Sequence, residues 1–493
     1  MITRKGNYVE GTSRSQLILL PDTLDDYVDE DDPVRFIDAF VDSLDMKQLG
    51  FKRSEPNEEG RPPYDPGDML KLYIYGYLNQ IRTSRKLERE CHRNVEAMWL
   101  MKKLAPDFKT IADFRKENID CIKLVFKEFL YLCKSLDLFG AELVAIDGSK
   151  FKAVNSKDRN FNEEKLLDRL KLINERVERY ISELEENDRS DGIVAAGQMK
   201  NLNEKVKQLQ AKKREYELLL GKMNESGQKE ISLTDPESRL MKNNGRIEVC
   251  YNTQLAVDSK NKLIAEYDLT NHHNDENQLS SMAKKAKDML GVESLEVTAD
   301  KGYHKFEEIK ECVDNGITPY VPEPSRGEAN AARRRGIPTI EFYEDKFIYD
   351  KKSNTYTCPA GKILSFCYWK KNQHNKRYAL YRTEGACFTC PFYMTKCTQG
   401  EEGRIMKRWE HEDVLDEMRT RLRSLDGWKK AEMRFELAEH PFGTIKRTFN
   451  QGYLLLRGLR KVRDEVGFTM LTYNMRRAIN ILGTKTLLAS LNT

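Results

Sequence analysis

Apolar residues in the first 138 positions recur at intervals of three and four, which is the spacing of an amphipathic helix. Asp32-Pro33 precedes one such run, Val34 to Val41, and Asp65-Pro66 precedes another, Met69 to Leu78. An acid followed by proline is typical of a helix start, because the carboxylate caps unpaired amides and proline needs no amide donor there. We therefore expect residues 1–138 to form an N-terminal helical domain.

Basic side chains lie within and between these short helices. They are Arg82, Arg85, Lys86, Arg89 and Arg93. Short helices carrying such residues suit a helix-turn-helix-like DNA-binding domain. A plain helical bundle with a solvated basic face accounts for the same pattern, and the residues alone leave both interpretations open.

From residue 139 the pattern changes to a short buried strand, Glu142 to Gly148, and residues 139–160 are assigned to the first part of a sheet. Residues 161–227 then carry two heptad-like apolar runs on either side of a polar turn. The runs are Leu166, Leu170, Ile173, Val177, Tyr180 and Leu184, then Leu202, Val206, Leu209, Tyr216, Leu220 and Met223. They predict an inserted antiparallel coiled-coil hairpin that serves as a spacer or a dimerisation arm.

Strand patterns resume in residues 228–310, the second part of the sheet. Ile247 to Asp258 and Leu263 to Leu269 flank a short polar link and predict an antiparallel pair. A helix then leads to a further strand, Ser294 to Asp300. Residues 311–410 form a Cys-rich insertion, and helical segments follow in 411–493. The expected fold class is α+β.

Composition narrows the class of protein. Of the 493 residues, 39% are hydrophobic, which is enough for sizeable cores and too many for a disordered chain. Neither a bilayer-spanning apolar run nor an apolar leader after Met1 is present, so we expect a cytoplasmic protein without a membrane partner. The 83 basic and 79 acidic side chains nearly cancel, so a nucleic-acid partner would need positive charge gathered locally.

Asp147 and Asp300 are the most informative residues, because each ends an apolar strand. A carboxylate placed in a crevice must be hydrogen-bonded or bind a metal, since burying an unpaired charge is costly. One such aspartate is most often a turn or cap residue, and a second weakens that interpretation. Glu439 adds a third carboxylate, on a segment that otherwise reads as a mixed-charge surface helix. Three carboxylates can hold two Mg²⁺ or Mn²⁺ ions for phosphodiester chemistry.

The three acids lie in blocks that resemble those of DDE transposases from bacterial insertion sequences. The blocks are Ala145–Lys150, Thr298–Tyr303 and Glu439–Lys446, and Arg457–Leu459 and Leu471–Arg477 resemble the C-terminal continuation of that group. The resemblance implies an RNase H-like catalytic core in which Asp147, Asp300 and Glu439 are the metal ligands. It also implies that Lys446 approaches DNA phosphates.

The third block departs from the family's signature. That signature places an arginine four residues before the glutamate and a tyrosine further upstream. Here Phe435 occupies the arginine position and Glu432 the tyrosine position, while Arg434 is adjacent. Glu436 is therefore a rival to Glu439 as the third acid.

Positive charge is concentrated around the third block, as contacts with DNA phosphates require. Together with a lysine of the second block, the candidate DNA-binding residues are Lys301, Arg434, Lys446, Arg447 and Arg457. Without the acidic blocks, the same charges would read as a solvated helix face.

Four of the ten cysteines have metal-site spacing, namely Cys358, Cys387, Cys390 and Cys397. A Cys-x-x-Cys pair, a following cysteine and an upstream Cys-Pro-Ala-Gly turn resemble a zinc ribbon-like structural site. A redox pair, an iron–sulfur site and four free thiols are the alternatives. The remaining cysteines read as ordinary thiols, and we expect no catalytic histidine.

The resemblance implies a Mg²⁺-dependent transposase that cuts insertion-sequence ends and joins them to target DNA. Its expected partner is double-stranded DNA, both terminal inverted repeats and target, with the chain acting as a homodimer associated with the nucleoid. Two alternatives stay open. One is a domesticated, non-cutting sequence-specific DNA-binding protein on the same fold, and the other is a general RNase H-type nuclease.

Overall fold

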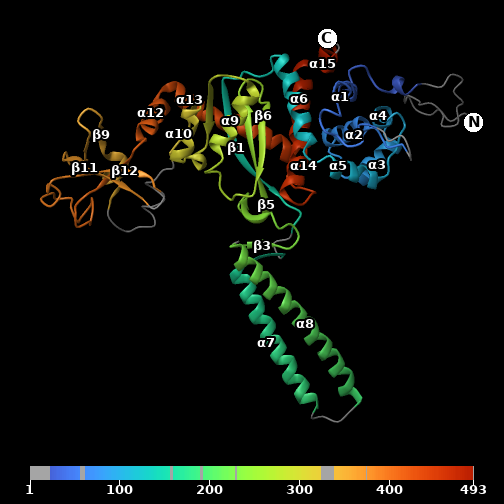
Figure 1. Ribbon diagram of the computed structural model, residues 1–493, viewed down its shortest axis with the longest axis horizontal. Coiled ribbons are helices and arrows are strands. Elements are labelled where there is room, and N and C mark those ends of the chain that lie inside the picture. The colour runs from blue at the N-terminus through green and yellow to red at the C-terminus, as the bar shows by residue number, and fades with distance from the viewer. Residues whose placement is uncertain are drawn as a thin grey trace, which may run out of the picture. The chain divides into compact units, whose positions relative to one another are not determined.

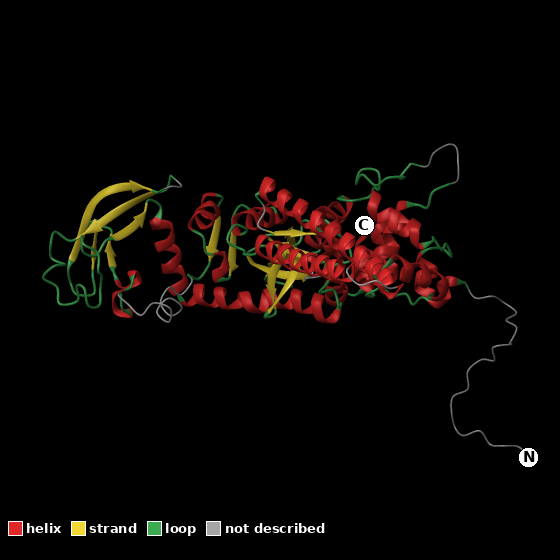
Figure 2. Cartoon of the chain, turned by 90° about the horizontal axis from the view of Figure 1, so that it is seen from below, coloured by secondary structure: helices red, strands yellow, loops and turns green. Residues whose placement is uncertain are grey.

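The computed structural model describes residues 23–55, 62–155, 159–188, 193–227, 230–323, 338–372 and 375–491 (Figure 1). The chain divides into two compact units, Met1–Phe129 with Gly467–Thr493, and Leu130–Val466. The expected segment 411–493 is therefore shared between both units. Helices and strands both contribute, so the fold is mixed α+β (Figure 2). Among the described helices, none is long and apolar enough to cross a bilayer.

The first unit is helical. It contains α1 (Pro33–Asp42), α2 (Pro66–Leu78), α3 (Ser84–Arg93), α4 (Val95–Leu100), α5 (Phe108–Glu117), most of α6 (Cys121–Ser135), the second part of α14 (Leu459–Leu482) and α15 (Thr484–Leu491). Asp32 and Asp65 cap α1 and α2 by accepting amide hydrogen bonds. Every residue of α2 is buried, and Phe468 of α14 stacks on Tyr73 and Tyr77. The C-terminal residues thus complete the core of the N-terminal unit.

The second unit is built on a six-stranded sheet. Its strands are β1 (Leu143–Lys152), β4 (Arg239–Asn243), β5 (Arg246–Asp258), β6 (Ile264–Thr270), β7 (Leu295–Ala299) and β8 (Ile317–Tyr320). They follow the order β4-β5-β1-β7-β8, and β6 also pairs with β5. β5 is antiparallel to β1 and β6, whereas β1, β7 and β8 run parallel. The prediction that Asp147 ends its strand is wrong, because β1 continues through Asp147 and pairs with β5 as far as Lys152, whereas Asp300 does follow the end of β7. β1 and β7 are neighbours inside the sheet.

Helices accompany this sheet. They are α9 (Leu279–Leu290), α10 (Phe306–Asp314), α12 (Glu412–Arg423) and α13 (Leu425–Gly443), and α13 continues into the π-helical turn η6 (Thr444–Thr448). Pro441 lies inside α13 without ending it. Phe442 of α13 packs on Phe151 of β1, with ring centroids 6.3 Å apart. Because side chains alternate along a strand, α13 covers the face of β1 that also carries Asp147 and Ser149.

Two long helices, α7 (Glu163–Asp188) and α8 (Ile193–Ser226), form an antiparallel hairpin (Figure 1). A short strand pair, β2 (Asn160–Asn162) and β3 (Glu230–Ser232), closes its base. The buried contacts include Leu166, Ile173, Leu202 and Val206, as the heptads predict. Met223 is also buried as predicted, and Leu219 is buried beside the predicted Leu220, which packs partly buried on the same cluster.

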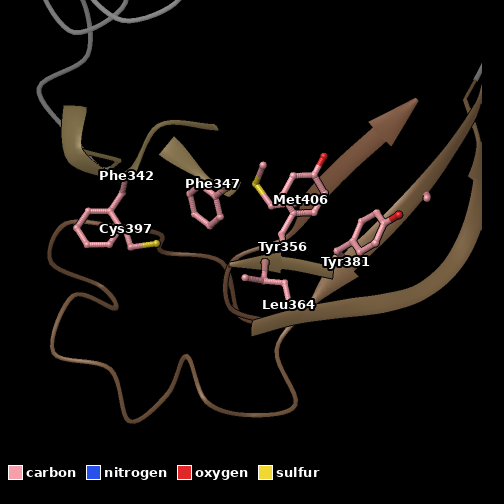
Figure 3. Close-up of a cluster of buried hydrophobic side chains, with 8 residues drawn as sticks. Phe342, Phe347, Tyr356, Leu364, Tyr381, Cys397 and Met406 are labelled. Atoms are coloured by element: carbon pink, nitrogen blue, oxygen red, sulfur yellow. The ribbon is translucent and has the colours of Figure 1, made fainter. Parts of the chain in front are cut away.

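The Cys-rich segment folds on a five-stranded antiparallel sheet with the order β13-β12-β11-β10-β9. Its strands are β9 (Ile348–Asp350), β10 (Thr355–Thr357), β11 (Ile363–Lys371), β12 (Arg377–Arg382) and β13 (Met406–Trp409). A hydrophobic core of its own holds these strands, formed by Phe342, Phe347, Tyr356, Leu364, Ala379, Tyr381, Cys397 and Met406 (Figure 3). The presence of Cys397 in this core places one of the four candidate thiols against the sheet.

Candidate active site

Asp147 lies inside β1 and Asp300 directly follows β7, and these two strands are parallel neighbours. Ile146 of β1 is paired with Ala299 of β7, and each aspartate is the next residue of its chain segment. Neighbouring strands lie about 4.8 Å apart, so the backbones of the two acids lie close together, and the charge of Asp300 contributes to the raised pKa of Asp147. Asp300 also starts the short turn η3 (Lys301–Tyr303), because its Oδ1 accepts a hydrogen bond of 2.7 Å from the Gly302 amide.

Negative charge at Asp147 is incompletely balanced. The pKa of Asp147 is raised to about 6, mainly by burial and with smaller increases from the nearby charges of Asp300 and Asp275. Two contacts act in the opposite direction. Arg434 Nη1 lies 3.3 Å from Asp147 Oδ2, and the Gly148 amide donates to Oδ1 at 2.8 Å. A partly buried carboxylate with acidic neighbours is a suitable ligand for a cation, which would relieve that repulsion.

Glu439 lies on α13, the helix that covers Asp147, and its side chain is exposed to solvent. Within the described part of the chain, no hydrogen bond or ion pair joins it to Asp147 or Asp300. Five residues earlier on the same helix, Arg434 reaches Asp147 instead. The rival acid Glu436 forms an ion pair with Lys262, which lowers the pKa of Glu436. Of the two glutamates, Glu439 is therefore the one whose carboxylate is not already paired.

Lys446 approaches β1 from η6. Its Nζ donates to Ser149 Oγ at 2.7 Å and to the Lys150 carbonyl at 2.8 Å, and it lies 4.9 Å from the centre of the Phe151 ring. Burial lowers the pKa of Lys446 to about 8. The lysine thus belongs to the neighbourhood of Asp147, although the sequence only indicated a surface contact with phosphates.

The other basic candidates differ in their surroundings. Lys301, Arg447 and Arg457 are exposed, so their charges are accessible to a ligand. Arg434 is mostly buried and already paired with Asp147. We conclude that the charge of Arg434 balances the Asp147 carboxylate. Of these four described candidates, only Lys301, Arg447 and Arg457 present charges that are exposed to solvent.

Sequence reasoning missed Asp275, which lies between β6 and α9. Its Oδ1 accepts hydrogen bonds of 2.6 Å from Asn252 Nδ2 and from Gln254 Nε2 on β5. In the sequence, Asp275 sits in a polar stretch that resembles an ordinary loop. The available signal was on β5, where Asn252 and Gln254 lie between the apolar runs Val249–Tyr251 and Leu255–Val257 and are fully buried. Buried amides of this kind need partners, and one of those partners is Asp275.

The four candidate metal-binding cysteines line one cavity in the Cys-rich segment, with room of about 20 Å³. The Lys362 amide donates to Cys358 Sγ at 3.3 Å, and the Thr383 hydroxyl donates to Cys387 Sγ at 3.2 Å. The pKa of Cys397 is raised to about 11, mainly by burial and with smaller increases from the other three thiols, while the charge of Arg404 acts in the opposite direction. Across the described residues, however, no group of three or more His, Cys, Asp or Glu side chains has a ready metal-binding arrangement.

Comparisons with known proteins match two parts of the chain. Residues 22–117 match the family described as Transposase domain (DUF772), and residues 357–479 match the family described as Transposase DDE domain. The second match contains the four candidate cysteines, Glu439 and Lys446, and it leaves Asp147 and Asp300 outside.

The remaining comparisons add little. A cryo-EM structure of a piggyBac transposase synaptic complex with hairpin DNA aligns with 94% of this chain and 79% of that chain, at 9% identity and a TM-score of 0.32. So low a score supports no conclusion. No curated protein matches the chain.

Proposed function

Since the chain is a DDE-type transposase of an insertion sequence, with two transposase domains, we propose that it cuts the element's ends and joins them to target DNA at a centre formed by Asp147, Asp300 and Glu439. The observation that carries this proposal is the shared register of Asp147 and Asp300 on β1 and β7. That register brings together two acids that are separated by 152 intervening residues in the sequence, 148 to 299.

We interpret the sheet as an RNase H-like core. Support comes from the strand directions, because β5 is antiparallel to β1 and β6, whereas β1, β7 and β8 are parallel. On this interpretation, the core comprises the two predicted parts, residues 139–160 and 228–310, together with β8 (Ile317–Tyr320), which pairs with β7 although it lies inside the predicted insertion 311–410. The hairpin 161–227 and the part of 311–410 that follows β8 are then the insertions, and 411–493 begins with helices of which α13 carries Glu439.

The acids at this centre fit divalent cations. Carboxylate oxygens are hard ligands, which favour Mg²⁺ or Mn²⁺ over softer metals. The raised pKa of Asp147, caused by burial and by neighbouring acids, indicates negative charge that a cation would stabilise. Bound ions of this kind lower the pKa of an attacking water or 3′-hydroxyl and stabilise the leaving oxygen.

Two basic side chains complete the centre. Arg434 keeps the Asp147 carboxylate oriented, and its guanidinium is of the kind that binds DNA phosphates. Lys446 is held by Ser149 and by the Lys150 carbonyl, beside the strand that carries Asp147. A buried ammonium in this position can hold a phosphate of the cleaved strand. The exposed Lys301, Arg447 and Arg457 extend the positive surface along the DNA backbone.

We assign DNA-end recognition to the N-terminal helical domain, predicted over residues 1–138, and to α3 in particular. Arg85, Lys86 and Arg89 of α3 are exposed, and Arg85 stacks on the exposed ring of Phe108. The opposite face of α3 is buried through Leu87 and Cys91. A helix with one buried and one basic face is suited to lie in the major groove. Arg82 does not belong to this face, because it is buried.

We propose a structural Zn²⁺ site in the Cys-rich segment. The four thiols line one small cavity, zinc prefers four sulfurs, and amide and hydroxyl donors to two of the sulfurs would stabilise thiolates. Gly361 has a φ of +73°, which allows the tight turn after Cys358. Zinc bound there would hold the loops at 387–397 against the small sheet.

Two element ends must be held together for transposition, and we propose that two chains do so through the hairpin. Its outer surface exposes the apolar side chains Leu167, Leu172, Ile181 and Leu218. Such residues do not contribute to the contact between α7 and α8, and burial against a second copy would stabilise a dimer. In sedimentation experiments with DNA ends, the parent chain should behave as a dimer. A double Leu172→Glu, Leu218→Glu variant should instead behave as a monomer, with one chain on each DNA end.

Strand cleavage tests the function. Labelled DNA carrying the element's inverted repeat should be nicked by the parent chain with Mg²⁺, and unrelated DNA should not. The Asp147→Asn, Asp300→Asn and Glu439→Gln variants should bind the repeat and lose nicking by at least ~10²-fold. Glu436→Gln is the matched control, because its carboxylate is paired with Lys262. Equal nicking of both DNAs would instead identify a general nuclease.

A further inference from the structure

Asp275 lies on the face of the sheet opposite Asp147, where it forms contacts with side chains of β1 and β5. Gly148 and Lys150 of β1 are paired with Gln254 and Asn252 of β5, so these four residues share one face. Asp275 accepts hydrogen bonds from both amides, and Lys150 Nζ lies 3.4 Å from its carboxylate oxygens. Its side chain is 21% exposed. A carboxylate with three donors is held in one orientation.

Gly148 allows this carboxylate to approach the backbone next to Asp147. A Cβ at position 148 would lie 2.6 Å from Asp275 Oδ1, and closer still to Gln254 Nε2. Neither distance is sterically allowed, so any larger residue would separate Asp275 from β1. Asp147 therefore places a candidate catalytic carboxylate on one face of the sheet, and Gly148 allows the close contact with Asp275 on the other face.

Tyr303 extends the network to the second aspartate. Its hydroxyl donates to Gln254 Oε1, while the Gln254 amide donates to Asp275. Tyr303 is fully buried, and burial raises its pKa well above the ordinary value, so the hydroxyl remains a donor. Tyr303 closes the turn that Asp300 caps. The turn carrying Asp300 and the strand carrying Asp147 are thus both tied to one carboxylate.

We infer that Asp275 is a positioning residue for the metal centre: through Gly148, Gln254 and Tyr303 it fixes the separation of Asp147 and Asp300 before cations bind. The inference rests on the proposed function. Two like charges held close together repel, and a rigid support lowers the reorganisation needed when a cation arrives. Asp275 does not contact the reacting atoms in this role.

Asp275 has a second effect through Lys150. The ammonium of Lys150 is 14% exposed and lies three residues from Asp147. Left unpaired, it would repel cations at the centre, because charges in a partly buried site are weakly screened. The ion pair with Asp275 offsets that repulsion, so removal of the Asp275 charge should weaken cation binding for two physical reasons.

Cation binding provides the test. Mn²⁺ affinity is measured by calorimetry on the full chain without DNA, for the parent, Asp275→Asn, Tyr303→Phe and the control Asp288→Asn, whose side chain is exposed on α9. We expect Asp275→Asn to weaken Mn²⁺ binding ~10–100-fold, the usual range for outer-shell partners of a metal site. Tyr303→Phe should weaken it less, and Asp288→Asn should leave it unchanged. In nicking assays, the Mg²⁺ concentration for half-maximal rate should rise in the same order, with repeat binding unaltered.

Each outcome separates the two proposals. The role of Asp275 alone would be overturned if Asp147→Asn loses Mn²⁺ binding while Asp275→Asn and Tyr303→Phe bind Mn²⁺ with the parental affinity. Parental Mn²⁺ binding and nicking in Asp147→Asn would overturn the proposed function itself. If Asp275→Asn does not fold, Tyr303→Phe decides, since it removes a single hydroxyl from a buried ring.

Discussion

Asp147 and Asp300 each stand one residue beyond the same parallel pair, Ile146 of β1 and Ala299 of β7. Parallel pairing aligns residues of the two strands at one level, so neither acid can move along its strand without changing the register of the sheet. Asp147 lies inside β1 and Asp300 directly follows β7, whereas Glu439 lies on the helix α13.

The first prediction concerns stability and pH. The pKa of Asp147 is raised to about 6 in the folded chain, above its value in an unfolded chain, so ionisation of Asp147 destabilises the fold. Without metal, Asp147→Asn should therefore increase the free energy of unfolding by about 2–3 kcal/mol above pH 6. The gain should shrink as the pH falls toward 4, where the folded parent is protonated. Urea unfolding at pH 7.5 and 4 measures both.

Asp288→Asn is the control for that experiment, since this carboxylate is exposed on α9. A parent chain that is more stable than Asp147→Asn at pH 7.5 would contradict the account. Such a result would mean that the ion pair with Arg434 dominates over burial and the acidic neighbours.

The second prediction compares two glycines in the same unit. Gly148→Ala should destabilise the chain by about 1–3 kcal/mol, because its Cβ overlaps Asp275 and Gln254. Gly443→Ala should stabilise it by about 0.5–1 kcal/mol, because Gly443 lies in α13 with nothing within 4 Å of a Cβ. Thermal unfolding of both variants measures the two changes in stability. Equal changes would show that Gly148 is not closely packed against Asp275 and Gln254.

The third prediction concerns zinc. Purified chain should contain one Zn²⁺ by plasma mass spectrometry, and Cys390→Ser should lose it, since three sulfurs bind zinc much less tightly than four. Cys367→Ser is the matched control, because Cys367 lies on β11 in the same segment but does not line the cavity. Retention of zinc in Cys390→Ser, or its absence from the parent chain, would refute the site.

The fourth prediction concerns DNA binding by α3. Arg89→Gln should weaken binding to the inverted repeat and reduce the slope of log affinity against log salt by about 1, as expected for one lost phosphate contact. Lys47→Gln is the control, since Lys47 is also exposed in this unit but pairs with Glu55. Fluorescence anisotropy over a salt series gives both slopes, and identical slopes would remove α3 from the interface.

Much of the architecture was predictable from local patterns. The caps at Asp32 and Asp65 and the strand before Asp147 follow from residues close together in the sequence, where capping and alternation act directly. Transposase identity, inferred from the acidic blocks, agrees with the two matched domains.

Long-range packing was not predictable in the same way. Nothing near Phe468 indicates that it stacks on Tyr73 and Tyr77, because aromatic residues suit any core. Asp275 was missed for a similar reason, since its partners lie on another strand and only the tertiary fold joins them. The role of Glu439 stays a prediction, because helix position alone does not fix the direction of an exposed side chain.

The most direct test of the central claim is the position of a bound cation. Crystals of the chain soaked in Mn²⁺ should give an anomalous difference peak about 2.2 Å from carboxylate oxygens of both Asp147 and Asp300, and Asp300→Asn crystals should lose it. A Mn²⁺ peak elsewhere in the parent chain, with Asp147 and Asp300 both unliganded, would contradict the account.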